Sequence, residues 1–155
     1  MRIATGVAAS LAAFALTVSG PVSAAGTAMG LAKAEKLRRL DIMLMVTGLR
    51  CRNTADNFQP EYGRFTTNHI AELNQASNEL KANLARQYGA AGANRALDRM
   101  STSMANQYGQ GHPWLNCKDL KTVTGNLAVV RGAEPLVAAA DQLLGARPAK
   151  FALAD

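Results

Sequence analysis

The chain has 155 residues, a formal net charge of +6 and few aromatic side chains: one Trp, three Tyr and four Phe. This length allows one domain with a single hydrophobic core and excludes two. Because aromatic and β-branched residues are scarce beside abundant Ala, Leu and Met, the composition favours helices over strands.

Residues 1–24 have the parts of a cleavable signal peptide. Arg2 supplies the positive charge, residues 7–18 form an uncharged apolar run, and the small side chains of Val22 and Ala24 fit a cleavage site after Ala24. Crossing a bilayer takes about 20 apolar residues, so this run of 12 disfavours a membrane anchor. We therefore predict a periplasmic or secreted protein with no transmembrane anchor after cleavage.

The remaining chain divides into three parts. Residues 25–32 are small and predict a flexible leader, and residues 146–155 predict a loose C-terminal tail. Residues 33–145 carry helical periodicity and form the predicted domain.

The first predicted helix starts at Lys33 and ends near Cys51, with Leu37, Leu40 and Leu44 at helical spacing. Residues 42–46 are apolar all round, which predicts a central position in a bundle.

A loop over residues 53–60 precedes a second, long helix that starts near Pro60 and stops at Gly89. Its apolar positions step by three or four residues throughout, which predicts one amphipathic helix. The stripe consists of Phe58, Tyr62, Phe65, His69, Leu73, Ala76, Leu80 and Leu84.

Three shorter helices follow: one from Gly92 to Tyr108, one from Pro113 to a break at Gly132, and one over residues 135–144. Their expected buried residues are, in order, Ala93, Leu97, Met100 and Met104; Trp114, Cys117, Leu120, Val123, Leu127 and Val130; and Leu136, Val137, Ala140 and Leu143. The fold expected from the whole pattern is an all-α bundle of four to five helices.

The two cysteines of the chain, Cys51 and Cys117, predict one disulfide in an oxidising compartment. The bond would staple the end of the first helix to the start of the fourth, and closing a loop of roughly 65 residues is worth about 4 kcal/mol. A reactive thiol and a metal site are the alternatives, although neither cysteine has a histidine at zinc-ligand spacing.

Two histidines carry the candidate chemistry. His69 and Glu72 have the spacing used in di-metal bundles, but the apolar stripe supplies no further carboxylate, so we predict no metal site. His112 lies beside Trp114 in a Gly-rich turn, where it either lines a binding pocket or, as we favour, caps and packs. A small hydrolase using His112 with Asp98 or His69 is the alternative function.

A basic cluster predicts an anionic envelope component as a partner, while a solvated helix end explains it equally well. Its members are Lys33, Lys36, Arg38 and Arg39, together with Arg50 and Arg52. A periplasmic protein is the other expected partner, and the oligomeric state stays open. Nucleic acid is excluded by export and by the lack of interleaved aromatic residues. The Gly109-Gln110-Gly111 start of a dinucleotide fingerprint lacks its third glycine and its strand, so we predict neither a cofactor nor a catalytic residue.

Two stretches carry a family resemblance: EKLRRLDIMLMVTGLRCR at residues 35–52 and LDRMSTSMANQYGQGHPWLNC at residues 97–117. They resemble a group of small exported helical proteins of Gram-negative bacteria with two cysteines, over roughly residues 33–145. Members are uncharacterised, and some are automatically labelled S-adenosyl-L-homocysteine hydrolase. This chain is far shorter than that NAD-dependent enzyme and lacks its dinucleotide-binding strand-turn-helix. The resemblance therefore implies an exported helical protein and assigns chemistry to no residue. From the export signal, the apolar first helix and the basic cluster we predict a non-enzymatic binding or envelope-associated protein.

Overall fold

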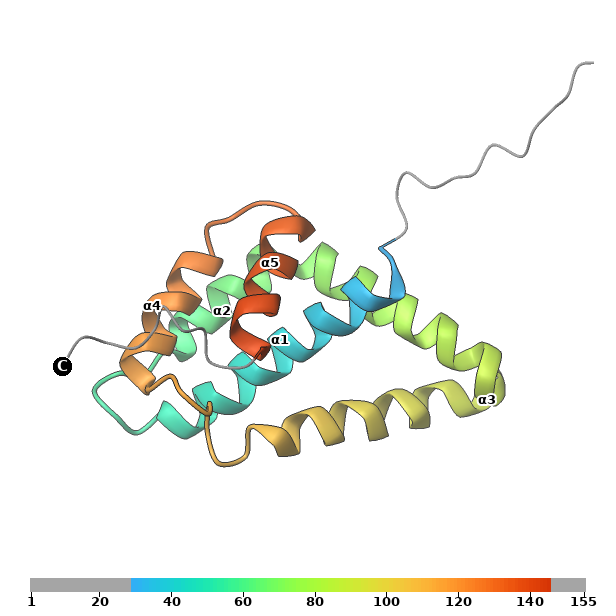
Figure 1. Ribbon diagram of the computed structural model, residues 1–155, viewed down its shortest axis with the longest axis horizontal. Helices are drawn as coiled ribbons and strands as arrows, with labels where there is room; N and C mark the ends of the chain where they lie inside the picture. The colour runs from blue at the N-terminus through green and yellow to red at the C-terminus, as the bar shows by residue number, and fades with distance from the viewer. Residues whose placement is uncertain (1–28, 146–155) are drawn as a thin grey trace, which may run out of the picture.

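The computed structural model describes residues 29–145, and this part of the chain is helical without strands. Its helices are α1 (Leu31–Cys51), α2 (Gln59–Asn68), α3 (Ile70–Gln107), α4 (Cys117–Leu127) and α5 (Ala133–Leu144) (Figure 1). The predicted all-α class is confirmed. The predicted signal peptide and C-terminal tail lie outside the described residues. None of the helices within this range is long and apolar enough to cross a membrane.

The start of α1 differs from the prediction. The helix begins at Leu31, two residues before the predicted start at Lys33, and Met29 before it is buried at 7% exposure. The buried thioether of Met29 belongs to the hydrophobic core, so the last residues of the predicted flexible leader are part of the packed domain.

Helix α1 is the centre of the bundle, because it packs against each of the other four helices (Figure 1). Leu37, Leu40 and Leu44 are buried as predicted. Residues 42–46 were predicted to be buried on every side of the helix, but Met45 is 38% exposed.

The predicted long helix from Pro60 to Tyr88 is wrong, because the chain leaves helical geometry at His69, with φ −115° and ψ 19°. The His69 ring is buried, and its Nε2 donates to the carbonyl oxygen of Leu127 at 2.8 Å. The apolar stripe nevertheless continues through the break, with Phe65 on α2 and Leu80 on α3 both in the core.

Helix α3 is bent sharply at Gly89, whose φ of 71° and ψ of 163° lie outside the helical region. The bend occurs where the sequence predicted a helix to stop, since glycine tolerates positive φ at low cost. The two arms of α3 form a V whose tip points away from α4 and α5 (Figure 1).

Helix α4 starts at Cys117 and not near Pro113, because a capping box sets its first turn. The Asn116 side chain accepts from the backbone N–H of Asp119 at 3.0 Å, and the Asp119 carboxylate accepts from the backbone N–H of Asn116 at 3.3 Å. The helix ends at Leu127, five residues before the predicted break at Gly132. In α5 the four residues predicted to be buried are all buried.

Candidate functional site

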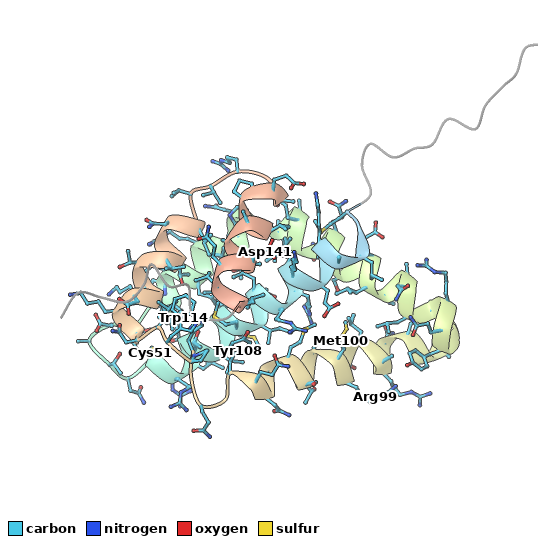
Figure 2. All side chains as sticks on the ribbon, in the orientation of Figure 1. Cys51, Arg99, Met100, Tyr108, Trp114 and Asp141 are labelled. Atoms are coloured by element: carbon cyan, nitrogen blue, oxygen red, sulfur yellow. A yellow bond between two sulfur atoms is a disulfide. The ribbon has the colours of Figure 1, made fainter. Side chains whose placement is uncertain are left out.

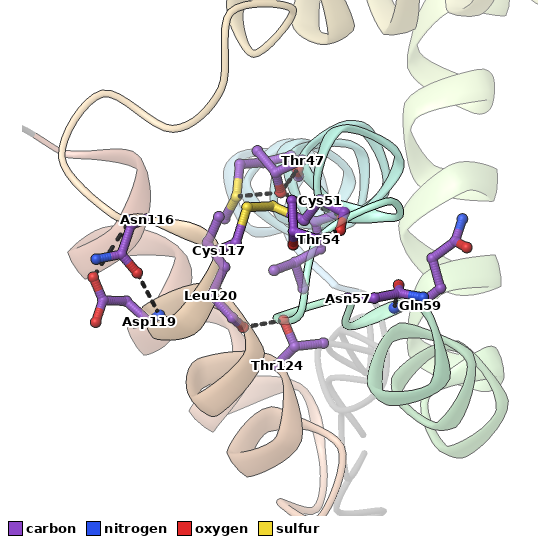
Figure 3. The surroundings of a disulfide bond; sticks show 12 residues. Thr47, Cys51, Thr54, Asn57, Gln59, Asn116, Cys117, Asp119, Leu120 and Thr124 are labelled. Atoms are coloured by element: carbon purple, nitrogen blue, oxygen red, sulfur yellow. Dashed lines mark hydrogen bonds between the residues drawn. A yellow bond between two sulfur atoms is a disulfide. The ribbon is translucent and has the colours of Figure 1, made fainter.

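The disulfide between Cys51 and Cys117 joins the last residue of α1 to the first residue of α4 (Figure 3). The two Cα atoms lie 5.7 Å apart, and the Cys51 side chain is buried at 3% exposure. Because both cysteines of the chain are bonded, the alternatives of a reactive thiol and of a cysteine metal site are overturned.

His112 holds the turn that leads into α4. Its Nδ1 accepts from the backbone N–H of Leu115 at 3.1 Å, and its Nε2 donates to the carbonyl oxygen of Leu143 in α5 at 2.9 Å. Burial lowers the pKa of His112, while the bond to the Leu143 carbonyl acts in the opposite direction. Both ring nitrogens of His112 are thus bonded to backbone groups. His112 therefore has a packing and capping role.

Trp114 stands against His112, with ring centroids 4.7 Å apart and an interplanar angle of 85°. It is half-buried and lies on the side of the molecule away from the bend of α3 (Figure 2). The indole forms one wall of a groove of about 210 Å³ between α4 and α5, which we call the α4–α5 groove. Its apolar lining consists of Trp114, Val123, Leu127, Val130, Ala139 and Leu143.

The α4–α5 groove exists because its two walls pack on other parts of the bundle. Helix α5 packs on α1, whereas α4 packs on α2 and α1. The side chains that α4 and α5 turn toward each other therefore leave space between them. Two amide side chains, Asn126 from α4 and Gln142 from α5, complete the lining, which contains no charged residue.

Four members of the predicted basic cluster have carboxylate partners within the molecule, namely Lys33, Lys36, Arg38 and Arg39. The Lys36 ammonium lies 2.5 Å from the Asp141 carboxylate of α5, and Arg39 lies 2.9 Å from Glu35 on its own helix. Asp141 extends from α5 above α1 in Figure 2. The Lys36–Asp141 pair links α1 to α5, and both cations have carboxylate partners, so the observations favour a structural role over a free anion-binding surface.

Arg38, the third residue of that cluster, belongs to a partly buried polar network. It donates to the Ser101 hydroxyl of α3 at 3.1 Å and lies 3.9 Å from the Asp41 carboxylate, which accepts from the Tyr62 hydroxyl of α2 at 2.9 Å. Burial raises the pKa of Asp41 despite these partners, and burial together with the Asp41 charge raises the pKa of Tyr62. This cross-link between three helices was not predicted, because Asp41 and Tyr62 are 21 residues apart.

The other residues considered for chemistry differ in their surroundings, since His69 is buried and Asp98 on α3 is exposed. His69 is 1% exposed and bonded to a carbonyl of the α4 end. Between residues 29 and 145, no group of three or more His, Cys, Asp or Glu side chains is arranged to hold a metal ion.

Comparisons with protein-family models, curated proteins and solved structures find no match to this chain.

Proposed function

We propose that this protein is an exported, non-enzymatic binding domain of the bacterial envelope, one of the small two-cysteine helical proteins that it resembles. The signal-peptide pattern of residues 1–24 supports export to the periplasm or beyond. The Cys51–Cys117 bond supports an oxidising compartment, because such bonds are rare where thiols are kept reduced.

The observation that carries the binding function is the single Trp of the chain on the wall of an apolar groove. A half-buried Trp combines a large apolar area with few rotatable bonds, which makes Trp a frequent anchor in binding surfaces. The neighbouring apolar residues would exclude water around an occupant, so a ligand in the groove gains the free energy of apolar burial.

The occupant that fits the groove is one or two apolar side chains of a partner polypeptide. The volume of about 210 Å³ is smaller than the ~300–1,000 Å³ of pockets for drug-sized molecules. The lining is uncharged, which disfavours an ionic ligand at this place. Asn126 and Gln142 offer amide donors and acceptors, one from each wall, for the peptide groups beside an anchoring side chain.

The hydrolase alternative is not favoured by the geometry of His112. A general base needs a ring nitrogen within reach of the substrate proton. In this chain one nitrogen accepts from the backbone of the turn and the other donates to Leu143.

Trp114 fluorescence provides the test, because the chain has no other Trp. We expect an uncharged hexapeptide, acetylated and amidated and rich in Leu and Phe, to shift the emission to shorter wavelength with saturation. Ala139→Leu fills the groove and should abolish the shift. Ala138→Leu adds the same volume at the neighbouring exposed position and should preserve it. A shift that does not saturate, or that survives Ala139→Leu unchanged, would refute the proposal.

A further inference from the structure

A second cavity lies on the other side of the His112 turn, against the disulfide. It has a volume of about 370 Å³, within the ~300–1,000 Å³ range of small-molecule pockets, and we call it the disulfide pocket. Its buried lining includes Cys51, Thr47 and Leu120, which Figure 3 shows around the sulfur–sulfur bond. Its exposed lining includes Arg50 and Gln110.

Arg50 is the one charged side chain among the residues that line this pocket. Its Nη1 donates to the carbonyl oxygen of Gly109 at 2.7 Å. This bond positions the guanidinium but leaves its charge uncompensated, because the acceptor is neutral. Arg50 differs in this respect from Lys36 and Arg39, whose positive charges both lie beside carboxylates. In the part of the chain that the structure describes, no carboxylate lies within ion-pair distance of Arg50.

The turn that meets Arg50 depends on a glycine. Gly111 has a φ of 104°, a backbone conformation that L side chains rarely adopt. Its backbone N–H donates to the carbonyl oxygen of Tyr108 at 2.9 Å, which closes the turn around Gly109. The disulfide anchors the same segment a few residues later, at Cys117. The guanidinium is therefore held by a turn that is fixed at both ends.

The pocket has the donors that a carboxylate needs and an apolar floor. A guanidinium has five N–H donors in a planar fork, so four remain beside the bond to Gly109. The side-chain amides of Gln110 and Asn116 add N–H donors in the same lining, which also contains Leu115 and Leu120. Two backbone N–H groups at the start of α4, those of Asn116 and Asp119, are already engaged in the capping box.

We infer that the disulfide pocket binds the carboxylate of a small organic acid with an apolar part, through Arg50. The carboxylate is either that of a free acid or the C-terminal carboxylate of a peptide. This inference goes beyond the proposed function, since both the site and the ligand chemistry differ from those of the uncharged α4–α5 groove.

The experiment is an NMR titration of the ¹⁵N-labelled, oxidised full chain, following the Arg50 Nε–Hε signal and the backbone signals of residues 110–117. The probes are 3-phenylpropionate, an acetylated tripeptide acid that ends in Phe, and the C-terminal amide of that tripeptide. We expect saturable shifts with at least one of the two acids, weaker at high salt, and none with the amide. Binding of both acids identifies a general carboxylate site, and binding of the tripeptide acid alone identifies a chain terminus.

Two variants make the test specific to the guanidinium. Arg50→Gln should weaken acid binding by about tenfold or more, because charge-assisted hydrogen bonds are lost. Arg64→Gln, at an exposed arginine that pairs with Glu61 outside the pocket, should leave the affinity unchanged. Equal shifts with the acid and the amide in the wild-type chain, no saturation with either acid, or equal affinity in Arg50→Gln would each overturn the inference. The proposed function has a separate test. It fails if the neutral hexapeptide gives no saturable shift of the Trp114 emission, or if Ala139→Leu leaves that shift unchanged.

Discussion

Removing the Cys51–Cys117 bond should destabilise the protein strongly. The bond joins residues 66 apart in sequence, and the chain-entropy relation for a loop of this length gives about 4 kcal/mol at 25 °C. Domains of this size have total stabilities of about 5–15 kcal/mol. The bond therefore supplies a large fraction of the stability of this domain.

Urea unfolding of the oxidised protein and of the Cys51→Ala/Cys117→Ala variant measures this loss, with helical circular dichroism and Trp114 fluorescence as two probes. We expect the unfolding free energy to fall by about 4 kcal/mol. The slope of that free energy against urea should rise, because the variant unfolds to a less compact chain. Mass spectrometry of the wild-type protein before and after reduction provides the control, since the oxidised form is lighter by two hydrogen atoms.

A loss below about 1 kcal/mol with an unchanged slope would refute the reasoning. It would mean that the bond does not restrict the unfolded chain as the loop length requires. Disagreement between the two probes would mean that α4 separates from the bundle before the remaining helices unfold, in which case one free energy does not describe the transition.

Four further substitutions test the packing and the charges. Gly48→Ala should lower the free energy of unfolding by about 1–3 kcal/mol, because the added Cβ would lie 3.3 Å from the Phe58 ring. Gly63→Ala has open space around the added Cβ and should raise that free energy by about 0.5–1 kcal/mol. Equal urea midpoints for the two variants would contradict this. The pKa of His112 is lowered on folding, so stability should decrease as pH falls below about 6.5, and His112→Gln should remove that decrease in thermal unfolding. Burial raises the pKa of Asp41, so the wild-type protein should gain stability as pH falls through that raised pKa, and an Asp41→Asn variant with the same gain would disprove the assignment.

The helices were predictable because burial broadly follows the apolar periodicity. The agreement is complete in the last helix, whereas of the six residues predicted to be buried in the fourth helix only Leu120 and Leu127 are buried. Leu136, Val137, Ala140 and Leu143 were read from sequence as the buried face of the last helix, and all four are buried. Such a pattern depends only on helix geometry and on which face meets the core. The disulfide was predictable for a different reason, since two cysteines allow only one intramolecular pair.

The errors in helix boundaries have two origins. At α4 the sequence contains two competing signals for the helix start. Asn116 three residues before Asp119 indicates a capping box, which sets the observed start, whereas Pro113 is typical of a first helical turn and predicts an earlier one. At His69 the sequence contained no local signal. The break coincides with a bond from its ring to Leu127, 58 residues away, which local patterns do not reveal.

The charged residues show most clearly what separates a sequence pattern from a site. Lys36, Arg39 and Arg50 lie on one helix, and clustering along the sequence indicates all three as candidate ligands for an anion. In the folded chain the first two face carboxylates, from α5 and from α1 itself, whereas the acceptor for Arg50 is a neutral carbonyl. An ion pair compensates the charge of Lys36 and of Arg39, whereas the Gly109 carbonyl orients the Arg50 guanidinium and leaves it without a carboxylate partner. The partner of each cation in the folded chain, and not its density along the sequence, is therefore the basis on which we propose Arg50 as a carboxylate ligand.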